Sequence, residues 1–299
     1  MSRRPIRRFA AAATSVVLLA AGCGSSETVN EAGDATTTTT AVAAETTAPP
    51  TTVTEIAEPV GPSFAIDVDV VRAQLEAELA DWQATNGAPA VSLSVRFRGV
   101  EPINVAVGVT DIVSGQAATT DDYFRIGSIT KPMTAAMVLQ LIEEGLIELD
   151  APVRDYLPGW LDGYEYADGI TIRQLMDHTN GLREYALDPV FYSETGTRLE
   201  IPITPDEIWA WLAEQEPLFA PGEGYSYETG GFLTLGTIIE QVTGNSAADE
   251  MRSRIFDPAG ARDIYLTPQE FPPQPVVHGY GRSLMYFAAT ALIGRTDEL

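Results

Sequence analysis

A serine and a lysine three residues apart lie in the segment GSITKP, residues 127–132. Lys131 is the one lysine in the 299-residue chain, and the other 17 of its 18 basic residues are arginines. Residues at i and i+3 share a helix face, so Lys131 can reach the hydroxyl of Ser128. Desolvation disfavours the charged form of an amine, and a neutral lysine can accept the serine proton, whereas a guanidinium stays protonated. This pair therefore predicts a nucleophilic serine activated by a lysine.

The residues that follow predict a buried helix that begins at this serine. From Ser128 to Glu144 the chain is apolar almost all round, and Gly145 ends the pattern. Pro132 is tolerated because it falls within the first turn. An oxyanion that develops at Ser128 would face the backbone N–H groups of the helix N-terminus. The S-x-x-K spacing is weak evidence alone, and its position between the segment DYFRIG and an apolar helix strengthens it.

The flanking segments predict a mixed α/β domain that positions this helix. Apolar residues at helical spacing predict a helix from Val68 to Trp82, with a stop at Asn86-Gly87. The segments AVSLSVRF and INVAVGV alternate apolar and polar residues, which predicts an antiparallel hairpin.

Capping signals predict further helices. Thr171 with Gln174, and Thr204 with Glu207, are typical of helix starts, and FLTLGTIIEQVTG predicts another helix that ends at its final glycine. Two strands followed mostly by helices predict an α/β or α+β domain with a large helical insert.

Three blocks of the chain resemble the serine β-lactamase and penicillin-binding protein superfamily. The resemblance is strongest to class C β-lactamases and related D-alanyl-D-alanine carboxypeptidases and esterases, and it spans roughly residues 70–280. It implies an antiparallel sheet flanked by helices plus a large helical subdomain, and it implies no metal or organic cofactor. The first block, YFRIGSITKPMTAAMVLQLIEEGLIELDAPVRDYLP, resembles the family's active-site helix region. The second block, TIRQLMDHTNGL, resembles its LLTHTSGL stretch. The third block, PGEGYSYETGGFLTLGTIIEQVTG, resembles its PG-x-x-F-x-YSN-x-GY-x-LLG-x-IIE-x-x-TG pattern.

The resemblance implies roles for four residues. Ser128 matches the nucleophile, Lys131 its lysine partner, and Tyr227 the tyrosine that acts with the lysine as general base. Thr229 stands where the family has a substrate-binding asparagine, so it offers one hydroxyl in place of an amide. The implied reaction is acyl transfer through a covalent acyl-enzyme. The implied substrates are D-Ala-D-Ala peptides of peptidoglycan precursors, β-lactams or simple esters.

The family's third motif, K-T-G or H-x-G, has no assigned counterpart. The single lysine is already used, and His178 lies in the HTNGL block, where a structural role at a helix end is favoured. His278 begins HGYG, but its surroundings match better the segment that precedes the family's last third. We therefore expect a C-terminally incomplete domain that lacks the C-terminal strands. The alternative function is a catalytically impaired surface lipoprotein that binds such substrates without turnover.

The N-terminus predicts export and a lipid anchor. A basic segment, MSRRPIRR, precedes an apolar run of 13 residues, FAAAATSVVLLAA, which is short for a membrane span. The apolar run leads to the segment LLAAGC, whose Cys23 is the single cysteine of the chain. This segment resembles a bacterial lipobox, and a plain secretory signal is the alternative interpretation. We expect a signal peptide at residues 1–22, a disordered Thr/Ala/Pro-rich tether at 23–63 and the hydrolase domain at 64–299. The expected location is the extracytoplasmic side of a bacterial membrane.

Composition excludes several other classes. The chain has 42 acidic and 18 basic residues and a net charge of −24, so it repels phosphate backbones and anionic headgroups. We therefore expect no nucleic-acid partner, and membrane contact only through the lipid. One cysteine permits no internal disulfide. The sequence lacks a G-x-S-x-G elbow, a G-K-[ST] phosphate loop and zinc-ligand spacing, and it leaves the oligomeric state open.

Overall fold

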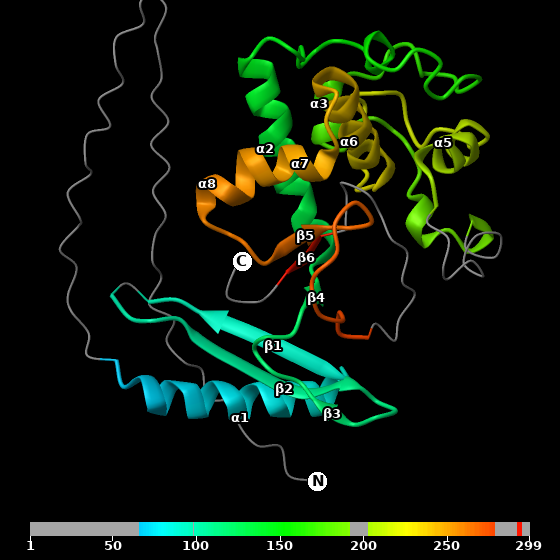
Figure 1. Cartoon of the computed structure of the whole chain (residues 1–299). Coiled ribbons are helices and arrows are strands. Elements are labelled where there is room, and N and C mark those ends of the chain that lie inside the picture. Colours follow the sequence, from blue (N-terminus) through cyan, green and yellow to red (C-terminus); the bar gives the residue numbers. More distant parts are fainter. Residues whose placement is uncertain (1–65, 98, 192–202, 279–291, 295–299) are drawn as a thin grey trace, which may run out of the picture. The chain divides into compact units, whose positions relative to one another are not determined.

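Residues 66–97, 99–191, 203–278 and 292–294 are the ones whose structure is described in the computed structural model (Figure 1). They all belong to one packing unit, Ser63–Leu299. The expected signal peptide, the tether and Cys23 lie outside these residues. Within them the chain is a mixed α/β fold with antiparallel sheets and helices, as the sequence predicted.

The first helix and hairpin confirm the sequence prediction. Helix α1 (Val68–Asn86) begins where the Asp67 side chain accepts the N–H of Val70, and it ends at Gly87, which has φ +69°. Strands β1 (Ala90–Val95) and β2 (Ile103–Asp111) pair antiparallel, and the short β3 (Gln116–Ala117) extends this sheet beside β2. Helix α1 packs along β2 (Figure 1). The hairpin therefore has one helix-covered face.

A second sheet leads directly to the serine. It has the order β4-β6-β5, with β4 at Phe124–Arg125, β6 at Leu292–Gly294 and β5 at Ile264–Leu266, and both pairings are antiparallel. Strand β6 lies in the C-terminal stretch, for which the sequence predicted no strand. Three residues are too few for an alternating pattern to show, and their partners are more than 20 residues away.

The other regular elements among the described residues are helices, most of them short. The two predicted capping boxes are present, at Thr171 with Gln174 and at Thr204 with Glu207. The predicted helix over residues 232–243 is also confirmed, and it ends at Gly244, which has φ +74°. The helical elements in chain order are η1 (Gly127–Ile129), α2 (Thr130–Glu143), η2 (Val153–Asp155), α3 (Ile172–Met176), η3 (Tyr185–Leu187), α5 (Pro205–Ala213), α6 (Gly230–Thr243), α7 (Ala247–Met251), the π-helical η4 (Arg252–Phe256) and α8 (Asp257–Ala259).

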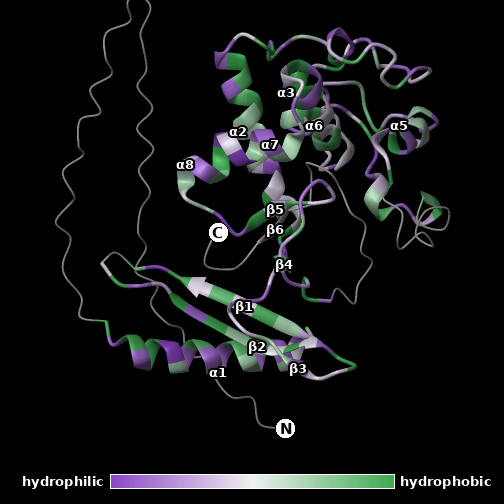
Figure 2. Cartoon of the chain, viewed as in Figure 1, coloured by the Kyte–Doolittle hydropathy of each residue, from purple (hydrophilic) through white to green (hydrophobic). Residues whose placement is uncertain are grey.

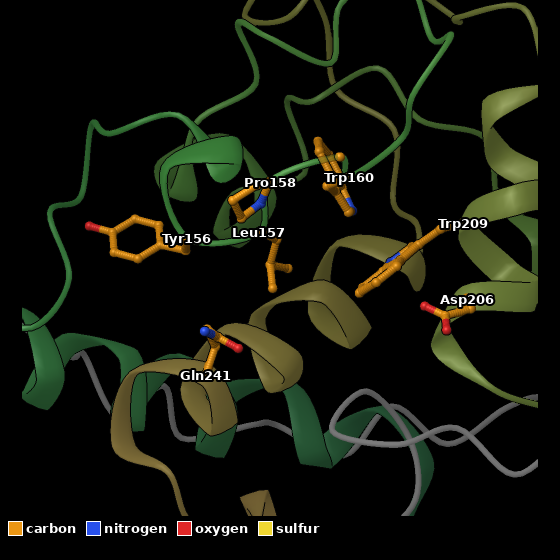
Figure 3. A pocket seen from close by; sticks show the side chains of 8 residues that line it. Tyr156, Leu157, Pro158, Trp160, Asp206, Trp209 and Gln241 are labelled. Carbon is orange, nitrogen blue, oxygen red and sulfur yellow. The ribbon is translucent and has the colours of Figure 1, made fainter.

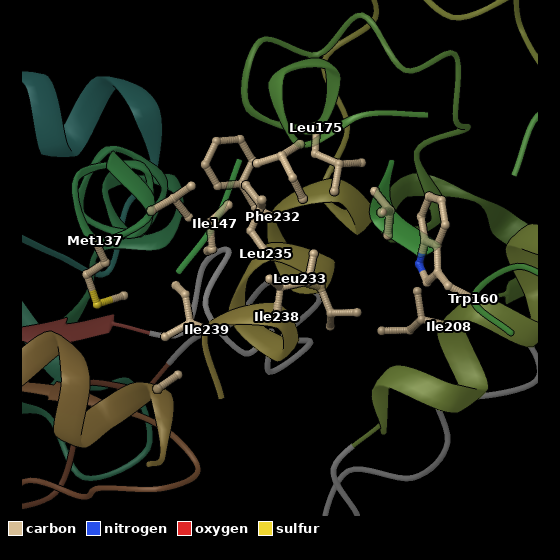
Figure 4. Close-up of a cluster of buried hydrophobic side chains, with 14 of the residues drawn as sticks. Met137, Ile147, Trp160, Leu175, Ile208, Phe232, Leu233, Leu235, Ile238 and Ile239 are labelled. Atoms are coloured by element: carbon tan, nitrogen blue, oxygen red, sulfur yellow. The ribbon is translucent and has the colours of Figure 1, made fainter. Parts of the chain in front are cut away.

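Helix α6 is the central element of the hydrophobic core. It contacts α2, α3, α5 and α7, and its N-terminal ten residues are nearly all buried (Figures 1 and 4). Colouring by hydropathy shows that apolar residues dominate α6 and α2, whereas polar residues alternate with apolar ones along α1 (Figure 2). Burying such side chains stabilises the fold by roughly 1.5–3 kcal/mol for each large aliphatic residue. A helix held on several sides is a rigid support for residues at its N-terminus.

One buried hydroxyl connects α6 to two tryptophans. The side chain of Thr234 is fully buried, and its Oγ1 donates to the carbonyl of Gly230 at 2.9 Å. The same oxygen accepts the indole N–H of Trp160 at 3.2 Å and that of Trp209 at 3.1 Å. A hydroxyl has one donor and two acceptor positions, so all three are used. Thr234 thereby accepts from the buried indole of Trp160 and the partly buried indole of Trp209.

Candidate active site

The structure brings Ser128 and Lys131 together at the start of α2. Ser128 lies in η1 and is exposed, whereas Lys131 lies in the first turn of α2 and is only 4% exposed. Lys131 Nζ donates a hydrogen bond to Ser128 Oγ over 3.3 Å. The predicted contact is present, although it spans a junction between a 3₁₀ turn and an α-helix. A solvent-accessible hydroxyl beside a buried amine is the geometry that an activated nucleophile needs.

Two aromatic rings flank the lysine. Lys131 Nζ lies 4.8 Å from the ring centroid of Tyr227 and 5.7 Å from that of Phe232. Tyr227 is 45% exposed, so its ring faces both the lysine and solvent. The rings keep water from part of the amine, and cation–π attraction holds it when it is charged. Tyr227 therefore lies beside Lys131, and its part in proton transfer stays a prediction.

A loop on one side of Tyr227 fixes the path of the chain that leads to it. Three backbone hydrogen bonds join residues 178–181 to residues 218–226. Gly181 has φ +79°, and a Cβ there would lie 2.2 Å from the carbonyl oxygen of Phe219. Only glycine permits this approach, because any side chain would collide with backbone. These contacts anchor the segment that leads to Tyr227, which lies three residues before α6 begins.

His178 supports the Tyr227 ring from this loop. The imidazole is 8% exposed, and its centroid lies 4.6 Å from that of Tyr227 and 5.3 Å from that of Phe232. Its Nδ1 accepts the backbone N–H of Glu228 at 3.4 Å and also lies 3.7 Å from Glu228 Oε1. One nitrogen cannot accept from the amide and donate to the carboxylate at once. We favour the hydrogen bond, because it is the shorter of the two contacts and the carboxylate already has two other donors. These contacts agree with the predicted structural role.

Glu228 is a site residue that the sequence did not predict. Its carboxylate is fully buried, and Asn180 Nδ2 donates to Oε1 at 3.0 Å. The backbone N–H of Gly231 donates to Oε2 at 2.7 Å, at the positive end of the α6 dipole. These donors compensate a charge that would otherwise be costly to bury. Its single sequence signal is its position between Tyr227 and Thr229.

Thr229 and Glu184 form a second polar pair at the site. Thr229 is 4% exposed, and its Oγ1 donates to Glu184 Oε2 at 2.7 Å, while Glu184 Oε1 accepts the N–H of Ala186 at 2.7 Å. Burial raises the pKa of the Glu184 carboxyl, and the hydrogen bonds from Thr229 and Ala186 and the charge of Lys131 oppose that shift. Thr229 therefore lies two residues after Tyr227, with its hydroxyl proton donated to Glu184. Direct contact of Thr229 with substrate stays a prediction.

A separate cavity of about 330 Å³ lies between the turn at residues 156–160, the start of α5 and the end of α6 (Figure 3). None of its lining residues is a predicted catalytic residue. They are Tyr156, Leu157, Pro158, Gly159, Trp160, Asp206, Trp209 and Gln241.

In the part of the chain that the structure describes, no three or more His, Cys, Asp or Glu residues gather as a metal site. None of the described helices combines the length and apolar character that a membrane crossing requires.

The fold and the position of the serine define a class of protein. An S-x-x-K serine at the start of a buried helix, next to an antiparallel sheet and a helical subdomain, is the arrangement of the serine β-lactamase and penicillin-binding protein superfamily. The chain belongs to the Beta-lactamase family, whose family model matches residues 71–296.

Several known proteins are similar to this chain. It is 34% identical over 184 residues to penicillin-binding protein 4 of Amycolatopsis lactamdurans, covering 61% of this chain and 46% of the relative. It is 33% identical over 204 residues to a D-aminopeptidase of Brucella abortus strain S19, and the match covers 68% of this chain and 37% of the relative. A solved D-stereospecific amidohydrolase from a Streptomyces species has a TM-score of 0.64 at 30% identity, covering 78% of this chain and 71% of that one. The chain thus spans less than half of these curated relatives.

Proposed function

We propose that this protein is a serine hydrolase that cleaves amide or ester bonds of D-amino-acid derivatives through a covalent acyl-enzyme. The observation that carries the proposal is the 3.3 Å contact between Lys131 Nζ and the exposed Ser128 Oγ. Similarity to a D-aminopeptidase and a D-stereospecific amidohydrolase supports this substrate class. Similarity to a penicillin-binding protein supports D-Ala-D-Ala peptides and β-lactams as further substrates of the same serine.

In the proposed reaction, Ser128 Oγ attacks the carbonyl carbon of the substrate, and the amine of Lys131 accepts the hydroxyl proton. The resulting oxyanion faces the backbone N–H groups at the start of α2. The leaving amine or alcohol then departs with a proton that Lys131 and Tyr227 deliver, which leaves an ester on Ser128. Water attacks that ester, the same residues accept its proton and pass it to Ser128 Oγ as the bond to the acyl carbon breaks, and the free acid is released.

The test is mass spectrometry of the whole protein after reaction with a fluorescent penicillin. We expect a mass increase equal to one penicillin, and fragmentation that locates the adduct on Ser128. Turnover is then followed as release of nitroaniline from D-alanine p-nitroanilide. An adduct without any release would favour the binding protein of the alternative reading. Absence of an adduct from both the penicillin and an activated D-alanine ester would contradict acyl transfer at this serine.

We also propose that the protein is a lipoprotein on the extracytoplasmic side of a bacterial membrane. The support is the sequence LLAAGC and the low-complexity segment that follows it. Mass spectrometry of the mature N-terminus should find Cys23 as the first residue, with acyl chains attached, and a Cys23→Ser variant should lose them. A mature chain that begins elsewhere without acyl groups would refute the anchor.

A further inference from the structure

Tyr227 is held in place by the residues around it. Among the described residues, no hydrogen bond engages its side chain, and its ring is partly exposed. The backbone N–H of Ser226 donates to the carbonyl of His178 at 3.1 Å, and that of Glu228 donates to Nδ1 of the same histidine at 3.4 Å. The His178 ring also packs against the tyrosine ring, with centroids 4.6 Å apart. The position of Tyr227 beside Lys131 therefore depends on the position of His178.

His178 has a backbone conformation that its surroundings must maintain. Its φ is +62°, and it is one of two non-glycine residues with positive φ in the described part of the chain. Such a conformation is strained for a residue with a side chain, and it persists only where neighbouring contacts determine it. Two residues further on, the buried Asn180 donates to the Glu228 carboxylate at 3.0 Å. This bond joins the loop that carries His178 to the segment that carries Tyr227.

The Glu228 carboxylate accepts from two different elements at once. Its Oε1 accepts from Asn180, and its Oε2 accepts the N–H of Gly231 in the first turn of α6 at 2.7 Å. A Cβ at Gly231 would lie 2.5 Å from Oε1, so the absence of a side chain there makes room for the carboxylate. Both partners are donors, and a glutamine could offer its single oxygen to only one of them.

The two side chains in this contact both differ from the sequence patterns that their blocks resemble. Asn180 stands at the serine of LLTHTSGL, and Glu228 stands at the serine of YSN. The two residues are 48 positions apart in the chain, yet they form a direct hydrogen bond. The charge buried at one position is compensated by a donor at the other. The contact is therefore a feature of this chain and not of the quoted patterns.

We propose that Glu228 is a positioning residue for Tyr227. Through Asn180 it fixes the loop that carries His178, and this loop holds the tyrosine ring beside the lysine. The inference rests on the proposed function, because it requires that Tyr227 take part in acylation. A displacement of about 1 Å can lower the rate of a chemical step about 10²-fold. Loss of the carboxylate should therefore lower the rate constant of acylation and not the affinity for the substrate.

The test measures acylation of Ser128 by a fluorescent penicillin in four proteins: the natural protein, Glu228→Gln, Tyr227→Phe and the double variant. We expect Glu228→Gln alone to lower the limiting rate constant about 10–100-fold, with little change in the penicillin concentration that gives half of that rate. In the Tyr227→Phe background the same change should cost less than about twofold, because residues that act through one another are not additive. A purely structural role would not depend on the tyrosine hydroxyl.

Glu250→Gln is the matched control. Glu250 is also a buried carboxylate with two side-chain donors, Asn245 and Arg254, and none of the three is a candidate site residue. The variant should lose stability, and the rate constant of its folded fraction should stay within about twofold of the natural value.

The outcomes separate this inference from the function on which it rests. Equal losses from Glu228→Gln in both backgrounds, or no loss in either, would overturn the positioning role and leave the serine hydrolase intact. Failure of the natural protein to be acylated at Ser128 would overturn the proposed function itself. If Glu228→Gln does not fold, Glu228→Ser replaces it, because its shorter side chain leaves no charge to bury and ends the contact with Asn180. The same loss, dependent on Tyr227, is then expected, and a loss independent of Tyr227 would refute the inference.

Discussion

Replacing Lys131 with arginine should slow the acylation of Ser128 by roughly 10²–10⁴-fold, which is the usual contribution of a general base. The variant keeps the positive charge but cannot accept a proton, because a guanidinium does not lose one in proteins. The lysine is only 4% exposed and lies 4.8 Å from the centroid of the Tyr227 ring, so a larger head group would also disturb the contact with Ser128 Oγ. The measurement is the rate of labelling by a fluorescent penicillin or an activated D-alanine ester.

The reverse exchange at an exposed position supplies the control. Arg173 donates two hydrogen bonds to Asp150 on the surface, and Arg173→Lys should label at a rate within about twofold of the natural protein, since exposed ion pairs contribute little. Labelling of Lys131→Arg at the normal rate would show that the lysine acts only through its charge.

Replacing Thr234 with valine should lower the free energy of unfolding by about 1–3 kcal/mol, although the two side chains have nearly the same shape. The change leaves the buried indole N–H of Trp160 without its acceptor, and an unsatisfied buried donor costs about 1–3 kcal/mol; the partly buried indole N–H of Trp209 loses the same acceptor. Urea unfolding followed by the fluorescence of the chain's four tryptophans measures the loss.

Thr237→Val, three residues further along α6, is the matched control. The Thr237 hydroxyl donates to the carbonyl of Leu233 and accepts from neither indole. The expected loss in the free energy of unfolding is therefore below about 1 kcal/mol. Equal losses in the two variants would mean that the valine itself, rather than the stranded indoles, causes the destabilisation.

The helices that sequence predicted well are those with local signals at both ends. At α5, Thr204 caps the helix, Pro205 occupies the first turn and Glu207 closes the capping box, all within four residues. The stop of α1 at Asn86-Gly87 is equally local. Strand β6 was not predicted, because its partners β4 and β5 are distant in sequence and its three residues carry no period of their own.

The residues of the candidate site also divide into those that local sequence signals predicted and those that depend on contacts distant in sequence. Ser128 and Lys131 are three residues apart, so their contact follows from helix geometry alone. Tyr227 and Thr229 were found through resemblance to a family and not from spacing. Glu184 was missed, because its contact with Thr229 spans 45 residues and no local pattern encodes such a pairing. The contact between Glu228 and Asn180, which spans 48 residues, escaped prediction for the same reason.

Every basic residue of the chain other than Lys131, which contacts Ser128, is an arginine. Amine-specific reagents can therefore modify a single side chain. The Nζ atom of Lys131 is the sole side-chain primary amine in the chain, and it lies against two aromatic rings. Reductive methylation with isotopically labelled formaldehyde would therefore place a single side-chain label, at the atom that would carry the proton. Its nuclear magnetic resonance signal would follow that proton without interference from any surface lysine.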